Sequence, residues 1–201
     1  YFRPVDPCVA PDGALYITDW YDGGVGGHAY NDPERGRIYR MVPKGKKLVS
    51  TEKPGPYSSD ADAIVALGSP NHATTFLARE RLIASGEKAI PALDAVVHGD
   101  DRNLKARALW VLDRIGGKGR DVVRGQLKSN DPAYRALAVR ILRRHGADSE
   151  ADLLAAVNDP DGEVFKESLL GLGLLSSKAS TQAIISAYAR YDGSDRYLLE
   201  T

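Results

Sequence analysis

The sequence is poor in the residues that most often mark a metal site, a redox centre or a cellular compartment. It has one Cys, one Met, three Phe and two Trp among 201 residues. The single Cys8 excludes an internal disulfide and a metal site built from several thiolates. Lys plus Arg and Asp plus Glu number 27 each, so no global charge attracts nucleic acid or an anionic membrane. No apolar run approaches the ~20 residues that span a bilayer, so we expect no membrane span.

What the sequence does contain is a repeat of 30 residues that runs through its last two-thirds. A fixed period of about 20–50 residues is typical of a stacked solenoid. Four positions keep one register over four copies, which predicts four similar structural units. These columns are Asn71, Asp101, Asp131 and Asp161; Ala78, Ala108, Ala138 and Ser168; Leu82, Leu112, Leu142 and Leu172; and Gly86, Gly116, Gly146 and Ser176.

Each copy has room for two helices. In the second copy an apolar stripe at spacings of three and four predicts an amphipathic helix that runs from Leu104 to Ile115. Asp101 stands where its N-cap should be, and Gly116 stands where it should end. A second helix then carries Val123 and Leu127, which have equivalents in the neighbouring copies. The pattern resembles HEAT repeats, whose helix pairs bury their apolar faces against one another.

The first 43 residues have a strand pattern instead. In CVAPDGALYITDW, Leu15 and Ile17 alternate with more polar residues, and Asp12-Gly13 is a strong signal for a tight turn. RIYRMV, from Arg37, predicts another short strand, and a glycine-rich loop lies between the two. Three strands leave open edges when they stand alone, so we expect the chain to be a piece of a longer protein.

The expected architecture is therefore a mainly α chain with a short antiparallel β segment at its start. Residues 44–69 combine a Lys-, Gly- and Pro-rich linker with a short helix, capped near Ser58 to Asp60 and apolar at Ile64, Val65 and Leu67. Residues 70–193 form an α-solenoid of about four HEAT-like helix pairs, and residues 194–201 begin a further helix.

The densest group of reactive side chains follows the second predicted strand. Carboxylates and an imidazole at a strand end suit metal binding or acid/base chemistry. The same residue types also cap turns and pack on a sheet, and no spacing among them matches a specific metal motif, so no metal site is assigned. His28, which follows two glycines, is the best candidate for a functional imidazole. The group is Asp19, Trp20, Tyr21, Asp22, His28, Asn31, Asp32, Glu34 and Arg37.

Charge is unevenly distributed along the repeats. The segment from Arg102 to Arg144 carries 12 Lys or Arg against three Asp, a net charge of +9. The segment from Asp148 to Glu167 carries seven acids against one Lys. One interpretation is a basic binding face for an acidic protein partner. The other is a set of solvated helix faces with ion pairs between adjacent repeats. Aromatics are not interleaved with the basic residues in sequence, so we expect no nucleic acid partner.

Two single residues have structural interpretations. His145 falls at the C-terminal end of a predicted helix, where a cation is favoured by the helix dipole. Cys8 lies in an apolar strand and is expected to be a small buried hydrophobic residue.

Residues 1–41 resemble the last blade of the β-propeller in glucose/sorbosone dehydrogenase-like proteins, a haem-binding family of Planctomycetes and Verrucomicrobia. The motif that carries the resemblance is DWYD, followed by GGH and GRIYR, which here includes Asp19, Trp20, Tyr21, Asp22, His28 and Arg37. In that family the propeller is followed by HEAT repeats and often by a c-type cytochrome domain. The order of strands, basic linker and helical repeats is the same here.

The resemblance implies an extracytoplasmic protein that oxidises a sugar or alcohol and passes electrons to haem c. Members of the wider propeller group use pyrroloquinoline quinone with calcium. The haem motif and the family's catalytic residues are not in these 201 residues, so no cofactor is assigned to them, and the repeats are expected to be a scaffold between propeller and cytochrome modules. The alternative is a non-catalytic scaffold that binds a protein or a polysaccharide. Under either hypothesis, the motif residues either bind a ligand or hold the strands of the blade together.

Overall fold

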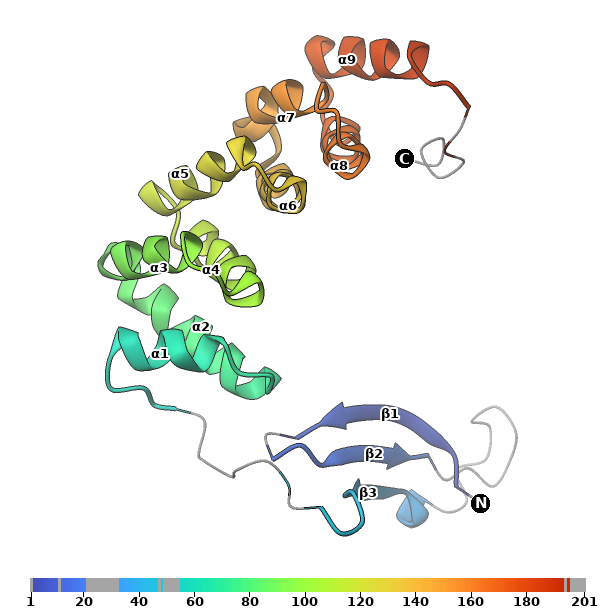
Figure 1. The fold of residues 1–201 in the computed structure, drawn as a ribbon. Coiled ribbons are helices and arrows are strands. Elements are labelled where there is room, and N and C mark those ends of the chain that lie inside the picture. The colour runs from blue at the N-terminus through green and yellow to red at the C-terminus, as the bar shows by residue number, and fades with distance from the viewer. Residues whose placement is uncertain are drawn as a thin grey trace. The chain divides into compact units, whose positions relative to one another are not determined.

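The computed structural model describes residues 2–10, 12–20, 33–46, 48, 55–193 and 195. The chain divides into two compact units, Tyr1–Arg81 and Leu82–Thr201, with the division inside one helix. The first unit contains a three-stranded antiparallel sheet in the order β1 (Pro4–Val9), β2 (Leu15–Asp19) and β3 (Arg37–Met41) (Figure 1). A short 3-10 helix, Pro33–Arg35, comes just before β3. The expectation of an antiparallel β segment at the start of the chain is therefore confirmed.

The turn between β1 and β2 is the one that the Asp-Gly pair predicts. Gly13 has φ 84°, a left-handed conformation that other residues adopt only with strain. Its N–H donates to the carbonyl of Ala10 at 2.9 Å, and the Asp12 carboxylate accepts from the N–H of Ala14 at 2.9 Å. That bond, together with an ion pair to Arg40, lowers the pKa of Asp12. The turn thus fixes the register between the first two strands.

Both faces of the sheet are open to solvent in the described residues. Leu15 and Ile17 on β2 are half-buried, but Val5, Val9 and Ile38 are each more than 60% exposed. Cys8 is exposed as well, so the expectation that it is buried was wrong. The reason is that β1 is an edge strand with nothing packed on either of its faces among the described residues.

Two helices complete the first unit. Helix α1 (Asp60–Leu67) starts after Ser59, whose hydroxyl accepts from the N–H of Asp62, as the cap signal predicted. Its buried residues are Ala63 and Leu67, whereas Val65 points to solvent, so the predicted apolar face was wrong at Val65. Helix α2 (His72–Ser85) starts after Asn71, whose side chain accepts from the N–H of Ala73 at 2.9 Å.

The first helices of the remaining copies start 30 residues apart, as the period predicts. They are α4 (Arg102–Ile115), α6 (Pro132–Leu142) and α8 (Gly162–Leu172). Each begins directly after an aspartate whose carboxylate accepts from backbone N–H groups of the first turn. These bonds satisfy donors that a helix terminus otherwise leaves unpaired. Pro132 occupies the first helical position of α6, where its missing N–H has no consequence.

The second helices follow sharp turns at the glycine column. Gly86, Gly116 and Gly146 all have left-handed φ, at 59°, 78° and 57°. Most of the second helices are extended by a 3-10 turn. They are η2 (Gly86–Ala89) with α3 (Ile90–Val97), α5 (Lys118–Gly125) with η3 (Gln126–Lys128), the end of η4 (Arg143–Ser149) with α7 (Glu150–Ala156), and α9 (Lys178–Ala189). The 3-10 segment η4 is kinked at Gly146, so its residues before the kink continue α6 in the first layer.

The helices of the second unit form two layers of a HEAT-like α-solenoid, which confirms the predicted fold class. Helices α4, α6 and α8 pack side by side as a first layer, and α3, α5, α7 and α9 form the second (Figure 1). The core lies between them. Leu82, Leu112, Leu142 and Leu172 are all fully buried, as are Leu93, Val123 and Leu153 of the second helices. The period-30 leucine column is therefore the central stripe of the core.

Two glycines of α5 differ in what surrounds them. A Cβ built on Gly119 would lie 2.4 Å from the carbonyl oxygen of Leu112, because α5 and α4 approach closely at that point. A Cβ on Gly125 would meet nothing within 4 Å, and this residue has helical φ and ψ. The two positions therefore separate the effect of packing from that of helix propensity.

We expect Leu112→Ala to lower the free energy of unfolding by about 2–5 kcal/mol, the usual cost of truncating a buried leucine. Urea denaturation followed by circular dichroism measures the change. The control is Leu174→Ala, at a leucine that is 76% exposed, which should change stability by no more than about 0.5 kcal/mol. Equal effects of the two substitutions would contradict the assignment of the leucine column to the core.

We expect Gly119→Ala to destabilise the protein by about 1–3 kcal/mol, because the added methyl group overlaps a backbone atom that cannot move alone. Gly125→Ala should instead stabilise it by about 0.4–1 kcal/mol, since the unfolded chain loses conformational freedom and the folded chain has space. Thermal unfolding of both variants measures the difference. If Gly119→Ala raised the melting temperature, α5 and α4 would not approach as closely as described.

Candidate functional site

The predicted site residues on the sheet are held by backbone contacts. The buried carboxylate of Asp19 accepts from the N–H of Arg3 at 2.7 Å. Arg37 is the register partner of Asp19 on β3, and its guanidinium donates to the carbonyl of Arg35 at 3.0 Å. Trp20 donates its backbone N–H to the carbonyl of Arg3, and its side chain is exposed. These contacts fit a residue set that locks the strand ends together.

Glu34 lies exposed in the 3-10 helix before β3, and the rest of the predicted cluster cannot be placed. Tyr21, Asp22 and His28 lie outside the described residues, as do Asn31 and Asp32. Ligand binding by this group therefore stays a prediction. Across the part of the chain that the structure describes, no three His, Cys, Asp or Glu side chains come close enough to hold a metal ion.

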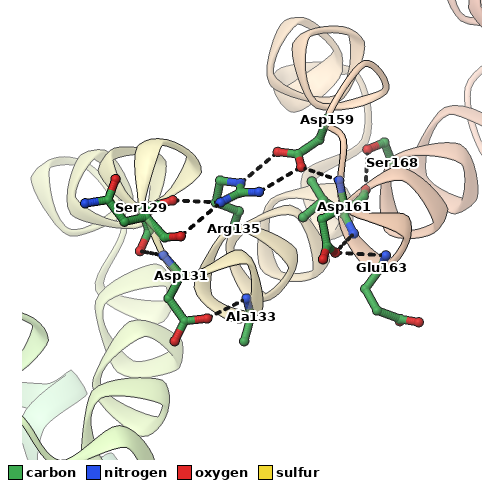
Figure 2. A network of polar contacts seen from close by, with 10 residues as sticks. Ser129, Asp131, Ala133, Arg135, Asp159, Asp161, Glu163 and Ser168 are labelled. Carbon is green, nitrogen blue, oxygen red and sulfur yellow. Dashed lines mark hydrogen bonds and ion pairs between the residues drawn. The ribbon is translucent and has the colours of Figure 1, made fainter.

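Several charged side chains of the repeats join neighbouring helices. Arg135 on α6 forms two bonds with Asp159 in the turn before α8, Nε to Oδ2 at 2.7 Å and Nη2 to Oδ1 at 2.9 Å (Figure 2). Its Nη1 also donates to the carbonyl of Ser129 at 2.9 Å. Asp159 in turn accepts from the N–H of Asp161, the N-cap of α8. The Arg135 guanidinium, with the Asp161 N–H, lowers the pKa of Asp159.

The second helices are linked by similar contacts. Arg124 on α5 donates from Nε to Asp152 on α7 at 2.9 Å. Glu150 at the start of α7 accepts from Ser180 on α9 at 2.7 Å and also from Ser177. Both serines lower the pKa of Glu150, Ser177 more strongly. These bonds join successive members of the second layer.

Two buried acids of the first layer have partners in the following or preceding copy. Glu167 on α8 is almost fully buried and lies 2.7 Å from Nε of Arg140, with Arg143 Nε at 3.3 Å. Asp113 on α4 is equally buried, and its Oδ1 lies 2.6 Å from Nε2 of His145. His145 therefore has a specific carboxylate partner, which the helix-dipole interpretation did not include. Pairing between adjacent repeats, one of the two interpretations of the charge asymmetry, is confirmed for these residues.

A few arginines of the basic segment remain available. Arg114 on α4 and Arg144 in η4 are exposed, and neither has an ion-pair partner within the described ranges. The Arg144 guanidinium lies over the ring of half-buried Trp110, 5.3 Å from its centre, a geometry in which the ring face attracts the cation. We call Trp110, Arg114, Arg140 and Arg144 the arginine–tryptophan face.

Sequence reasoning found the net charge of this segment and missed the face itself. An aromatic residue does lie among the basic ones in space, because Trp110 and Arg144 are 34 positions apart in sequence but adjacent in the first layer. The signal was present in the period, since Arg114 and Arg144 are 30 residues apart. Which arginines are already paired depends on contacts between copies and was not visible.

A groove also lies on the second layer, with a volume of about 590 Å³. Its wall includes Leu127, Ala155 and Val164, and its charged lining includes Arg124 and Asp159, both already in ion pairs. The groove is therefore mostly an apolar gap between neighbouring copies, and Arg124, Asp152 and Asp159 of its charged lining are held in ion pairs. None of the helices in the described residues is long and apolar enough to cross a membrane.

Comparison with known proteins adds little beyond the fold. No protein-family model matches the chain, and no curated protein matches it. Among solved structures, the complex of CpcE and CpcF of phycocyanin lyase from Nostoc sp. PCC7120 is 18% identical, with a TM-score of 0.45, covering 64% of this chain and 97% of that chain. An engineered protein is 23% identical, with a TM-score of 0.36, covering 64% and 68%. Similarity at this level says nothing about activity or partners.

The lowered pKa of Asp159 predicts a pH-dependent contribution to stability. A carboxylate whose pKa is lower in the folded chain stabilises the fold above its unfolded pKa of about 3.9 and loses this effect as the pH falls through its folded value. Asp159→Asn should therefore lower the melting midpoint by several degrees at pH 7, and the difference from the unaltered protein should shrink as the pH falls below about 4. Asp148→Asn, at an exposed residue, is the control and should have no effect at either pH. A difference that persists unchanged at low pH would contradict the role of the charged pair.

Proposed function

We propose that the helical repeats are a non-catalytic scaffold that holds an acidic protein segment on the first layer. The observation that carries this proposal is the pair of exposed arginines, Arg114 and Arg144, beside Trp110. Other arginines of the same basic segment have carboxylate partners, as Arg124 and Arg140 do in a neighbouring copy and Arg135 does within its own.

The chemistry of this face suits protein recognition. Arginine and tryptophan are the residues most enriched among those that dominate interface energies. A guanidinium makes two parallel hydrogen bonds to a carboxylate, which gives direction as well as attraction. Stacking on Trp110 restricts the Arg144 side chain before binding, so less conformational freedom is lost when a carboxylate arrives. An acidic partner is therefore favoured over a neutral one.

The sheet favours a second proposal about the longer protein. Large apolar side chains are exposed on the two outer strands, among them Val5, Val9, Ile38 and Met41. In a β-propeller, neighbouring blades cover such faces, and each blade is an antiparallel sheet of four strands. We therefore propose, with the resemblance to glucose/sorbosone dehydrogenase-like proteins, that the strands belong to a last blade. The parent protein would then be extracytoplasmic and oxidise a sugar or alcohol with pyrroloquinoline quinone and calcium, and haem c would accept the electrons.

The scaffold proposal is tested by fluorescence anisotropy with a labelled peptide of alternating Asp, Glu and Gly residues. We expect saturable binding that weakens as salt is raised, and a loss of at least about tenfold in affinity when Arg114 and Arg144 are both changed to Glu. The matched control is Lys128→Glu with Lys178→Glu, an equal charge change at exposed lysines of the second layer. If the control loses as much affinity as the arginine variant, binding is due to net charge and the proposed face is wrong.

The proposal about the parent protein needs the full reading frame. We expect the full-length protein, loaded with pyrroloquinoline quinone and calcium, to oxidise an aldose or alcohol with a dye as electron acceptor. Omission of the quinone is the control and should abolish dye reduction. A full-length protein that has no propeller, or that shows no turnover over a broad panel of sugars and alcohols, would remove the oxidoreductase proposal and leave the scaffold proposal intact.

A further inference from the structure

The solvent-facing positions of the first layer change character in one direction along the repeats. Two columns of the 30-residue period lie on or directly after α4, α6 and α8, on the side away from the leucine core. One is Trp110, Arg140 and Leu170, and the other is Arg114, Arg144 and Leu174. In both columns the residue is cationic in the third copy and leucine in the fourth. The layer therefore has a basic end and an apolar end.

Contacts between the helices show that the two columns belong to one surface. Arg144 extends from the third copy to the Trp110 ring of the second. Arg140 extends the other way, with Nε 2.7 Å from the Glu167 carboxylate of the fourth copy, while more than half of its side chain stays exposed. The third copy is thus in contact with both of its neighbours. Side-chain contacts therefore connect the basic end of the layer to the helix that carries the apolar end.

The apolar end of the first layer exposes two leucines to solvent. Leu170 on α8 is 37% exposed, and Leu174, just after that helix ends, is 76% exposed. The equivalent positions in the two preceding copies are polar or aromatic and are engaged with neighbours or water. Two adjacent exposed leucines beside a row of arginines indicate a partner that has both carboxylates and aliphatic groups.

We propose that this surface binds one linear protein segment in a fixed direction, with its carboxylates over Arg114 and Arg144 and its aliphatic side chains over Leu170 and Leu174. The inference rests on the proposed scaffold function and adds the chemistry and polarity of the bound segment. Charge complementarity places the acidic part at α4 and α6, and the two leucines place the aliphatic part at α8.

The spacing of the helices sets the length of the segment. Packed helices lie about 8–10 Å apart, so the distance from α4 to α8 is about 16–20 Å. An extended chain advances about 3.3 Å per residue, so five or six residues cover that distance. The carboxylates should therefore precede or follow the aliphatic residues by about three positions, which is the step from α6 to α8.

A second copy of this chain is a weaker candidate for the occupant. Its acidic stretch would have to supply the carboxylates, but three of the seven acids, Asp152, Asp159 and Glu167, are already bound to arginines of their own chain. A single-stranded nucleic acid would use the arginines and Trp110 but would gain nothing from the two leucines. Both occupants give distinct results in the experiment below.

The experiment measures binding of four labelled ligands to this chain by fluorescence anisotropy, three 12-residue peptides and one oligonucleotide. One has three acidic residues, a two-residue Gly-Ser spacer and two leucines, and the second has the reverse order. In the third the leucines are replaced by Ser, and the fourth is an oligothymidine of similar length in place of a peptide. We expect one of the two leucine peptides to bind at least about tenfold more tightly than its reverse and than the serine peptide.

Variants assign the effect to the two ends of the surface. Leu170→Ser with Leu174→Ser should remove the preference for one orientation and leave binding of the serine peptide unchanged. Arg114→Gln with Arg144→Gln should weaken all three peptides. Leu174→Ser alone, outside α8 and highly exposed, repeats the first test with little risk to folding, and circular dichroism checks each variant.

The outcomes separate this inference from the proposed function. If both orientations and the serine peptide bind equally, and only the arginine variant weakens them, the scaffold proposal holds and the directional segment is wrong. If no peptide binds, both are wrong. Tighter binding of oligothymidine than of any peptide, or self-association of the unliganded chain that the arginine variant abolishes, would also overturn the inference.

Discussion

The repeats depend on one constraint, which is that a pair of short helices cannot bury its apolar face without a neighbouring pair. Helices α5 and α7 have only 8 and 7 residues, too few to be stable alone in water. Fully buried residues in each copy, among them the column leucine such as Leu112 or Leu142, supply the shared core. The aspartate N-caps fix where each first helix begins, so the column leucine occupies the same buried position in each copy. The 30-residue period of the sequence results from that packing.

The same stacking decides which charges are available for function. A partly buried cation at the boundary between copies is stable only with a partner, and Arg135 finds one in Asp159. Buried Glu167 likewise holds Arg140 and Arg143. In these pairs, arginines of the basic segment are neutralised by carboxylates of the acidic segment. The charged residues available to bind a partner are those without a carboxylate partner in the stack. The contacts of individual arginines therefore indicate a binding surface better than the net charge of a segment does.

The regular features of the fold could be predicted from sequence, because each depends on residues close together in the chain. An N-cap such as Asp101, a left-handed Gly116 and a buried Leu112 act within one or two turns of helix. The features that sequence reasoning missed depend on neighbours that are distant in sequence. Asp113 and His145 are 32 positions apart, and the exposure of Cys8 depends on what covers β1. Of the six site residues predicted from the strand motif, only Asp19, Trp20 and Arg37 are described.

The two units call for different kinds of partner. The sheet exposes valine, isoleucine and methionine on its outer strands, so whatever covers it must be apolar and extended, as another part of a β protein is. The first layer of the repeats exposes arginines with two leucines at one end, so its partner must carry carboxylates. An apolar cover for the sheet would not satisfy Arg114 and Arg144, and an acidic segment would not cover Val5 or Ile38. The two proposed functions therefore rest on separate surfaces, and the failure of one leaves the physical case for the other unchanged.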